Sequence, residues 1–124
     1  MKRLLAVCII SCCFQIANAQ LANTSWTGTI EAGGNTINVL WKVATDTSYF
    51  YGTDDNSLLD VSIITIQDGT LNLRKISGLS SCGSEDGLYT FEIKDNTLTI
   101  YLKKDDCPDR AAVLDKVSFT KSAN

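Results

Sequence analysis

The sequence predicts an all-β fold, a small antiparallel up-and-down β-barrel of about eight strands with one disulfide. The first observation is a set of three two-residue turns, Gly-Gly at residues 33–34, Asp-Gly at 68–69 and Asp-Asn at 95–96, which are typical of tight hairpins. The second is that apolar and polar residues alternate on both sides of each turn, in a register that places apolar residues opposite apolar ones. Hairpins between chain neighbours close most simply into an up-and-down barrel, and a β-sandwich is the alternative.

Residues 1–19 have the pattern of a signal peptide, and residues 20–124 form a single predicted domain. A positive start precedes an apolar run over residues 4–10 that is too short to span a bilayer, and the small residues before and at Ala19 are typical of a cleavage site. We therefore expect a secreted or periplasmic protein with no integral membrane segment after cleavage. The alternative is a bacterial lipoprotein signal, with the chain anchored at Cys12.

Charge and composition exclude several partners and chemistries. The predicted signal holds two of the eleven basic residues and none of the fourteen acidic ones, so residues 20–124 carry nine basic and fourteen acidic residues, a net charge of −5. No basic stripe is present, and we expect no nucleic-acid partner. The chain has no histidine, which removes the commonest general base and a frequent metal ligand. We expect no cofactor, no metal, no catalytic residue and no enzymatic activity.

The first hairpin is predicted to pair residues 24–31 with the stretch after the Gly-Gly turn. The expected apolar pairs are Ile30 with Ile37, Gly28 with Val39 and Trp26 with Trp41. Gly28 stands among these large residues and is expected to leave room for another element to cross closely. The two tryptophans are predicted to fill one end of the core.

The middle of the chain predicts three further strands. Residues 48–52 form a short aromatic strand, and residues 53–57 form a polar loop in which the acidic residues do not have calcium-loop spacing. A strand rich in β-branched residues follows over 58–66, and the Asp-Gly turn leads into a strand over 70–76. The expected apolar pairs are Ile66 with Leu71 and Ile64 with Leu73.

The last hairpin is predicted to be closed at its open end by a disulfide. Its expected apolar pairs are Ile93 with Leu98, Phe91 with Ile100 and Tyr89 with Leu102. Cys82 and Cys107 flank these strands and are the two cysteines that remain after the predicted signal. A bridge between them stabilises the fold by about 3–4 kcal/mol through loop closure. Residues 108–114 predict one helical turn, and residues 116–121 predict the last strand.

An eight-stranded barrel is of a size that side chains fill or that holds one small ligand. The predicted core contains many large residues, which favours a filled lower half and at most a shallow cup above it. Its members are Trp26, Ile30, Ile37, Val39, Trp41, Ile64, Ile66, Leu71, Leu73, Tyr89, Phe91, Ile93, Leu98, Ile100, Leu102, Val117 and Phe119.

Seven residues are candidates for contact with a small apolar ligand. Arg110, three residues after Cys107, has two interpretations. It packs beside the disulfide and binds carbonyls or Asp side chains at the barrel end, or it anchors a ligand carboxylate at the mouth. The aromatic candidates equally fit an ordinary core. The full set is Trp26, Trp41, Tyr49, Tyr51, Tyr89, Phe91 and Arg110.

Two stretches of the chain resemble small secreted bacterial lipocalin-like domains, which are of the calycin type. The Ser-Trp-Thr-Gly-Thr sequence at 25–29 is similar to their opening strand, and residues 87–91 with the Cys-Pro-x-Arg motif at 107–110 are similar to a hairpin-plus-Cys-Pro-x-Arg pattern in these proteins. The chain departs from true lipocalins in being shorter, in lacking their Gly-x-Trp order at the first strand and in having no C-terminal helix pattern. The resemblance implies the barrel fold, the disulfide and Arg110 as family features.

From the fold and this resemblance we expect an exported protein that binds a small apolar ligand without catalysis. The alternative is a protein-binding module, such as a secreted protease inhibitor or a cell-surface interaction domain. The loops at 44–47 and 53–57 are small and polar, whereas an inhibitor is expected to present a rigid apolar or basic tip. This observation favours the small-ligand hypothesis.

Overall fold

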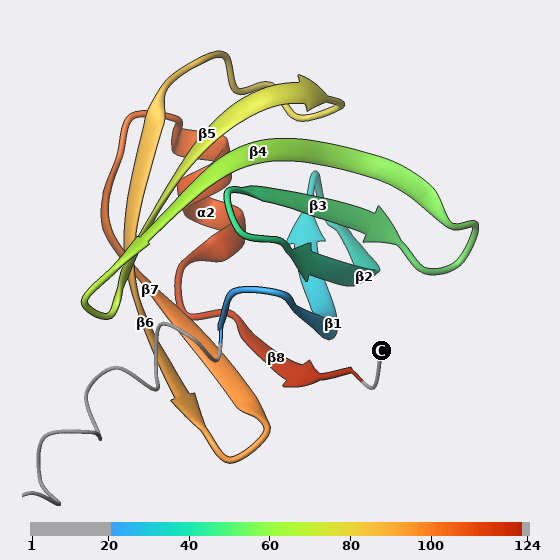
Figure 1. Ribbon diagram of the computed structural model, residues 1–124. Helices are drawn as coiled ribbons and strands as arrows, with labels where there is room; N and C mark the ends of the chain where they lie inside the picture. The colour runs from blue at the N-terminus through green and yellow to red at the C-terminus, as the bar shows by residue number, and fades with distance from the viewer. Residues whose placement is uncertain (1–20, 123–124) are drawn as a thin grey trace, which may run out of the picture.

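The computed structural model describes residues 21–122, in which eight strands form a closed antiparallel barrel in chain order (Figure 1). The predicted up-and-down barrel is therefore confirmed. The predicted signal peptide, its cleavage after Ala19 and the alternative anchor at Cys12 lie outside the described residues. The strands are β1 (Thr24–Ala32), β2 (Asn35–Val43), β3 (Thr47–Gly52), β4 (Ser57–Gln67), β5 (Thr70–Gly78), β6 (Asp86–Lys94), β7 (Thr97–Asp105) and β8 (Ser118–Lys121).

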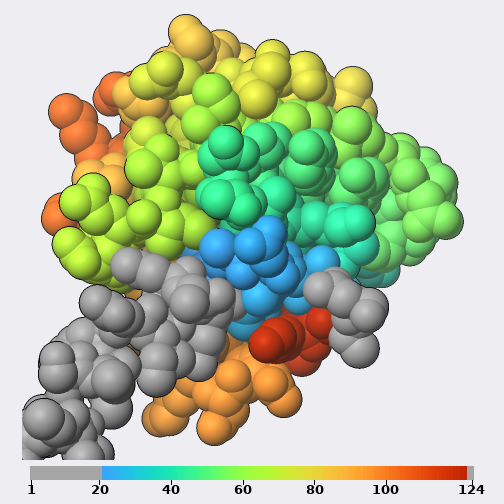
Figure 2. Space-filling view, viewed as in Figure 1, coloured from blue at the N-terminus to red at the C-terminus, as the bar shows by residue number. Residues whose placement is uncertain are grey.

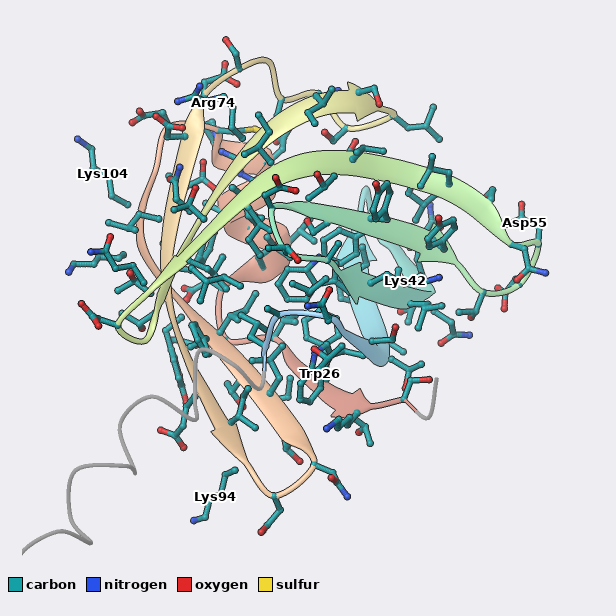
Figure 3. The ribbon with its side chains drawn as sticks, viewed as in Figure 1. Trp26, Lys42, Asp55, Arg74, Lys94 and Lys104 are labelled. Atoms are coloured by element: carbon teal, nitrogen blue, oxygen red, sulfur yellow. A yellow bond between two sulfur atoms is a disulfide. The ribbon has the colours of Figure 1, made fainter. Side chains whose placement is uncertain are left out.

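The three hairpins have the predicted registers. Trp26 pairs with Trp41 across the first hairpin, and the apolar pairs predicted for the second hairpin are also present. In the third, the predicted pairing holds from the turn as far as Tyr89 and Leu102. Because side chains alternate between the two faces of a strand, these registers place one apolar set inside the barrel. Figure 3 shows Trp26 inside the barrel, whereas Lys42, Lys94 and Lys104 point outward.

One predicted core residue, Leu102, is on the surface instead, with 39% of its area exposed. A β-bulge lies next to it in the β6–β7 pairing: Tyr89 pairs with Leu102, but Leu88 pairs with Lys104. Lys103 is therefore left without a partner in this ladder, and the inward–outward alternation of β7 is broken at this point. The sequence pattern could not show this because it assumes an uninterrupted ladder.

The two ends of the barrel differ in filling. At the end that holds the β2–β3 loop and the β4–β5 and β6–β7 turns, the interior is filled by fully buried large side chains. We call this the packed end. The Trp41 ring stacks on Phe50 with ring centroids 5.1 Å apart and lies 5.6 Å from Phe119. Buried residues that fill this end include Leu21, Trp26, Trp41, Val43, Leu71, Leu98 and Phe119.

Gly28 on β1 allows the last strand to approach closely, as expected. A Cβ atom at this position would lie 2.7 Å from Cδ1 of Phe119 and 3.1 Å from the Ser118 carbonyl oxygen. The Phe119 ring on β8 therefore occupies the space that a side chain at position 28 would need. This contact joins the first and last strands of the barrel.

The helix α2 (Pro108–Leu114) packs against β7 and β1 (Figure 1). Pro108 suits the first turn of a helix because its missing N–H has no partner there in any case. Arg110 and Leu114, four residues apart, share one face of the helix and are both buried. The structure thus gives seven residues where the sequence predicted one helical turn, and Leu114 joins the core.

The predicted disulfide between Cys82 and Cys107 is confirmed, with Cα atoms 5.6 Å apart. It joins the loop between β5 and β6 to the residue before α2. Such bonds form and persist in oxidising compartments. Within residues 21–122, no helix is long and apolar enough to cross a membrane.

Candidate functional site

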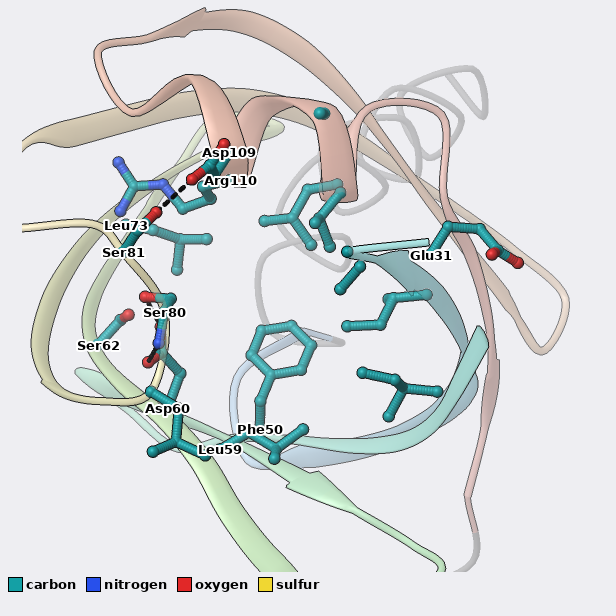
Figure 4. Close-up of a pocket in the computed structure, with 18 residues that line it drawn as sticks. Glu31, Phe50, Leu59, Asp60, Ser62, Leu73, Ser80, Ser81, Asp109 and Arg110 are labelled. Atoms are coloured by element: carbon teal, nitrogen blue, oxygen red, sulfur yellow. Dashed lines mark hydrogen bonds between the residues drawn. The ribbon is translucent and has the colours of Figure 1, made fainter. Parts of the chain in front are cut away.

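The barrel contains a cavity of about 590 Å³ at the end opposite the packed end. We call this the cavity end. It lies between the β1–β2 turn, strands β3 to β5, the helix α2 and the loop of residues 79–85, which we call the mouth loop (Figure 4). The side chains that face it are largely apolar. The apolar members of the lining are Ile30, Ala32, Ile37, Phe50, Leu59, Leu73, Leu79, Ala112, Val113 and Leu114.

Phe50 connects the cavity to the packed end. Its ring lines the cavity on one side and stacks on the Trp41 ring, with planes inclined by 7°. Leu73, which also lines the cavity, is almost completely buried. The inner surface of the cavity is therefore formed by side chains that the core already holds in place, so an apolar molecule would enter a preformed site.

Five polar residues of the lining lie together on one side, and Glu31 lies on the other (Figure 4). Asp60 on β4 accepts hydrogen bonds from the Ser80 backbone N–H at 3.3 Å and from the Ser80 hydroxyl at 2.9 Å. Asp109 on α2 accepts a hydrogen bond from the Ser81 hydroxyl. The polar group consists of Asp60, Ser62, Ser80, Ser81 and Asp109, and Phe50 stands opposite.

The mouth loop is fixed at several points around the opening. Gly78, with φ of +129°, leads into it from β5, and a Cβ atom there would collide with Asp60 and the Leu59 carbonyl. Leu79 follows with 80% of its surface exposed at the mouth, and its N–H donates to the Leu59 carbonyl at 2.8 Å. With the serine–aspartate bonds and the disulfide at Cys82, these contacts hold an apolar residue at the entrance.

A buried ion pair supports the wall behind the cavity. Arg110 donates to Asp105 through Nε and Nη2, both at 2.7 Å, and Nη2 also donates to the Glu85 carbonyl at 2.9 Å. The Asp105 side chain is fully buried and accepts a further hydrogen bond from the Tyr89 hydroxyl. Gly87 makes room for the pair, since a Cβ atom there would lie 2.8 Å from Nε of Arg110.

The three groups of this network shift each other's pKa values. Burial disfavours the ionised form of Asp105, but the hydrogen bonds from Arg110 and Tyr89 outweigh it and lower the pKa of the carboxyl. Burial raises the pKa of Tyr89, and the hydrogen bond to Asp105 raises it further. Arg110 and Asp105 are therefore held as a charged pair with a neutral phenol beside them.

The candidate ligand residues lie in three different places. Four of the aromatics, Trp26, Trp41, Tyr89 and Phe91, belong to the buried core and are not among the residues that line the cavity. Tyr49 and Tyr51 flank Phe50 on β3, so alternation directs them to the outer face, where their ring centroids lie 6.5 Å apart. Arg110 contributes to the lining, but Figure 4 shows its guanidinium directed away from the cavity.

Several lining residues were not singled out from the sequence. Phe50 alternates with two tyrosines, and its inward direction follows once the register of β3 with β2 is known. Leu79, Ala112 and Val113 lie outside the strands, so no strand pattern marks them. One sequence signal could have drawn attention to Leu79: it is an apolar residue outside the strands, three positions before Cys82.

The acidic loop after β3 has a local structural role. Asp55 accepts hydrogen bonds from the Ser57 N–H at 3.1 Å and from the Ser57 hydroxyl at 2.7 Å, which form the turn into β4. Among residues 21–122, no group of three or more His, Cys, Asp or Glu side chains is placed to hold a metal ion.

Comparison with known proteins finds no matching family model, no matching curated protein and no matching solved structure. The class of this protein is therefore defined by its own geometry. It is a closed eight-stranded up-and-down β-barrel with one disulfide and a largely apolar cavity at one end.

Proposed function

We propose that this protein is an exported lipocalin-like binding protein that holds one small apolar ligand in the cavity at the end of its barrel, without catalysis. The observation that carries the proposal is the cavity of about 590 Å³ with its largely apolar lining. Binding sites for small molecules are concave, mostly apolar, and typically about 300–1,000 Å³ in volume.

The driving force in this proposal is removal of apolar surface from water. Each Å² of buried apolar area contributes about 25 cal/mol, and a ligand that buries about 300 Å² gains on the order of 7 kcal/mol before the cost of immobilisation. Because the cost of immobilisation offsets part of this gain, we expect dissociation constants between about 10 μM and 1 mM for ligands that fit. Leu79 at the mouth and Phe50 inside provide apolar contact at both ends of the path.

The disulfide and the resemblance of residues 25–29 and 107–110 to secreted bacterial lipocalin-like domains support the proposed place of action. Disulfides such as Cys82–Cys107 form and persist mostly in oxidising compartments. We propose that the protein is secreted or periplasmic after removal of residues 1–19, with a lipid anchor at Cys12 as the alternative.

A second candidate function is protein binding, and one surface feature favours it. Figure 2 shows β3 and β4 side by side on the surface of the barrel, and apolar side chains of β4 are exposed there. Leu58 is 47% exposed and pairs with Tyr51, while Ile63 is 43% exposed two residues beyond Val61, which pairs with Tyr49. Exposed apolar patches of this kind occur at protein interfaces.

The proposed ligand binding is tested with N-phenyl-1-naphthylamine, an uncharged dye whose emission rises in apolar surroundings. The purified protein is titrated with the dye, and a saturable rise in emission is expected. The variant Ala112→Trp places a large ring at the exposed side of the lining, and we expect it to weaken dye binding by at least about tenfold by filling the site.

The matched control is Thr45→Trp, which introduces the same ring at an exposed position in the loop at the packed end. It is expected to bind the dye like the unchanged protein. No saturable binding, or equal binding by both variants, would contradict the proposal. Equal binding would place the dye on the outer face and favour the second candidate.

A further inference from the structure

We infer that the cavity selects apolar molecules that carry a cationic amine over those that carry a carboxylate. The inference rests on the proposed function, because it names the chemical class of ligand for the same cavity. It is based on three observations: the sign of the charge that faces the cavity, the hydrogen-bonding state of the polar wall, and one hydroxyl that faces the cavity without a partner.

The charge presented to the cavity is negative. Asp60 and Asp109 both line it, on the same side (Figure 4). Glu31 also contributes to the lining, but its carboxylate points away and accepts a hydrogen bond from Thr36. A cation that binds near Asp60 and Asp109 therefore meets carboxylates, and an anion meets like charges.

The cationic residue of the lining does not offset this charge. Arg110 is neutralised by its two hydrogen bonds to the buried carboxylate of Asp105. Its remaining nitrogen, Nη1, has no hydrogen-bond partner but is buried away from the cavity surface, so a bound molecule cannot reach it. A ligand carboxylate would have to break the pair with Asp105 to use this arginine.

The polar wall is composed of hydrogen-bond acceptors. The Ser80 and Ser81 hydroxyls donate their protons to Asp60 and Asp109 respectively, which leaves these oxygens with lone pairs only. An ammonium group has three donors and no acceptor, whereas a carboxylate is an acceptor only. These two serines and two aspartates therefore match an ammonium head and have no hydroxyl proton left to donate to a carboxylate, although Ser62 can still donate one.

Ser62 adds a hydroxyl to the polar side of the cavity. The residue is 8% exposed and lines the cavity, and its hydroxyl makes no hydrogen bond to another of residues 21–122. Figure 4 shows its side chain directed toward the cavity beside Ser80. This hydroxyl opens onto the cavity, so it is available to the polar head of a bound molecule. A polar head placed beside Asp60 would supply the partner.

The test compares three molecules with the same tail: dodecylamine, 1-dodecanol and sodium dodecanoate. Each displaces N-phenyl-1-naphthylamine from the purified protein at neutral pH, below the concentration at which it forms micelles. We expect dodecylammonium to bind about tenfold or more tightly than dodecanoate, with dodecanol between them. The preference is expected to shrink at high salt, because salt screens charges near the surface.

The variant Asp60→Asn/Asp109→Asn is expected to bring the ammonium-to-carboxylate ratio to within about twofold and to leave dodecanol binding unchanged. Asp109→Asn alone is expected to lower the logarithm of this ratio by about half as much. Because Asp109 is exposed, the single variant is expected to fold, so it tests the inference even if the double variant misfolds. The control Asp95→Asn removes one charge in the opposite turn, where φ is +56° and Asn is well tolerated.

The outcomes separate this inference from the proposed function. Equal or tighter binding of dodecanoate overturns the inference and leaves ligand binding intact. A preference for the amine that survives in both aspartate variants also overturns it, since the charge then comes from elsewhere. Failure of all three molecules and of the dye overturns the proposed function, and this inference with it.

Discussion

The two ends of this barrel use the same strands in different ways. At the packed end, Trp26, Trp41 and Phe119 are at most 1% exposed, and the rings of Trp41 and Phe119 contact each other across the interior. At the cavity end, the opening is surrounded by half-buried or exposed residues, and the structure is held by a disulfide and an ion pair. The comparison teaches that apolar packing stabilises one end, whereas a disulfide and an ion pair in the wall stabilise the other and leave its interior open.

The largest expected effect is at the packed end. Phe119→Ala removes a fully buried ring, and we expect the free energy of unfolding to fall by about 3–5 kcal/mol. Leu79→Ala at the mouth, where the side chain is 80% exposed, is expected to change it by less than about 0.5 kcal/mol. Urea denaturation followed by tryptophan fluorescence measures both. Similar losses in the two variants would remove the distinction between the ends.

The disulfide is expected to be the strongest support of the cavity end. The double variant Cys82→Ser/Cys107→Ser releases the mouth loop from α2, and we expect a loss of about 3–4 kcal/mol from the entropy gained by the unfolded chain. The melting temperature, compared with that of the unchanged protein with and without reductant, measures it. An unchanged melting temperature in the variant would show that the cavity end is held by its other contacts.

Acid is expected to weaken the cavity end through Asp105. Its pKa is lowered in the folded protein, so its ionised form stabilises the fold above the unfolded value of about 4, and this contribution is lost as the pH falls through the folded value. Asp105→Asn is expected to lose about 2–4 kcal/mol at neutral pH and to show a flatter fall of stability toward low pH.

Asp86→Asn is the matched control for this prediction. Asp86 pairs with Arg74 at the surface, where both side chains are about half exposed, and hydrogen bonds from Arg74 and Asn72 lower its pKa. An exposed ion pair contributes little to the free energy of unfolding, so we expect Asp86→Asn to lower the stability only slightly at neutral pH. Equal losses for the two variants in urea titrations across the acid range would contradict the special role of the buried pair.

The smallest expected changes in stability come from replacing one glycine at each end by alanine. Gly28→Ala places a Cβ atom 2.7 Å from the Phe119 ring and is expected to cost about 1–3 kcal/mol through overpacking. Gly52→Ala, on β3 at the cavity end, has its nearest neighbour at 3.4 Å and is expected to be close to neutral. Thermal unfolding of the two variants measures the difference. An unchanged melting temperature in Gly28→Ala would show that the Phe119 ring can move to make room, and that the packed end is not tightly packed there.

Features set by local pattern could be predicted from the sequence. Each two-residue turn fixes a register, and a one-residue slip would expose the apolar face, so the pairs Trp26–Trp41 and Ile64–Leu73 follow from alternation alone. The disulfide follows in the same way, because the hairpin brings Cys82 near Cys107. The core of the packed end was predictable for this reason.

The cavity could not be predicted in the same way, because it is assembled from segments distant in the chain. Phe50, Leu79 and Val113 meet only when β3, the mouth loop and α2 surround one opening. The serine–aspartate bonds of the polar wall span 20 and 28 positions in the sequence. Bulges were a further obstacle. One extra residue in a strand, as at Lys103, reverses the inward and outward directions of the side chains beyond it, and nothing in the residue types of the strand indicates this.

The closure of the barrel by β8 also bears on how the chain folds. β1 meets β8 through two residue pairs, Trp26 with Lys121 and Thr27 with Thr120, and Phe119 completes the core beside them. These partners lie more than ninety positions apart, a separation that slows folding. Until the last strand is in place, β1 and β7 have open edges that can pair with other chains. The docking of the C-terminal strand is therefore the folding step before which this barrel is most exposed to aggregation.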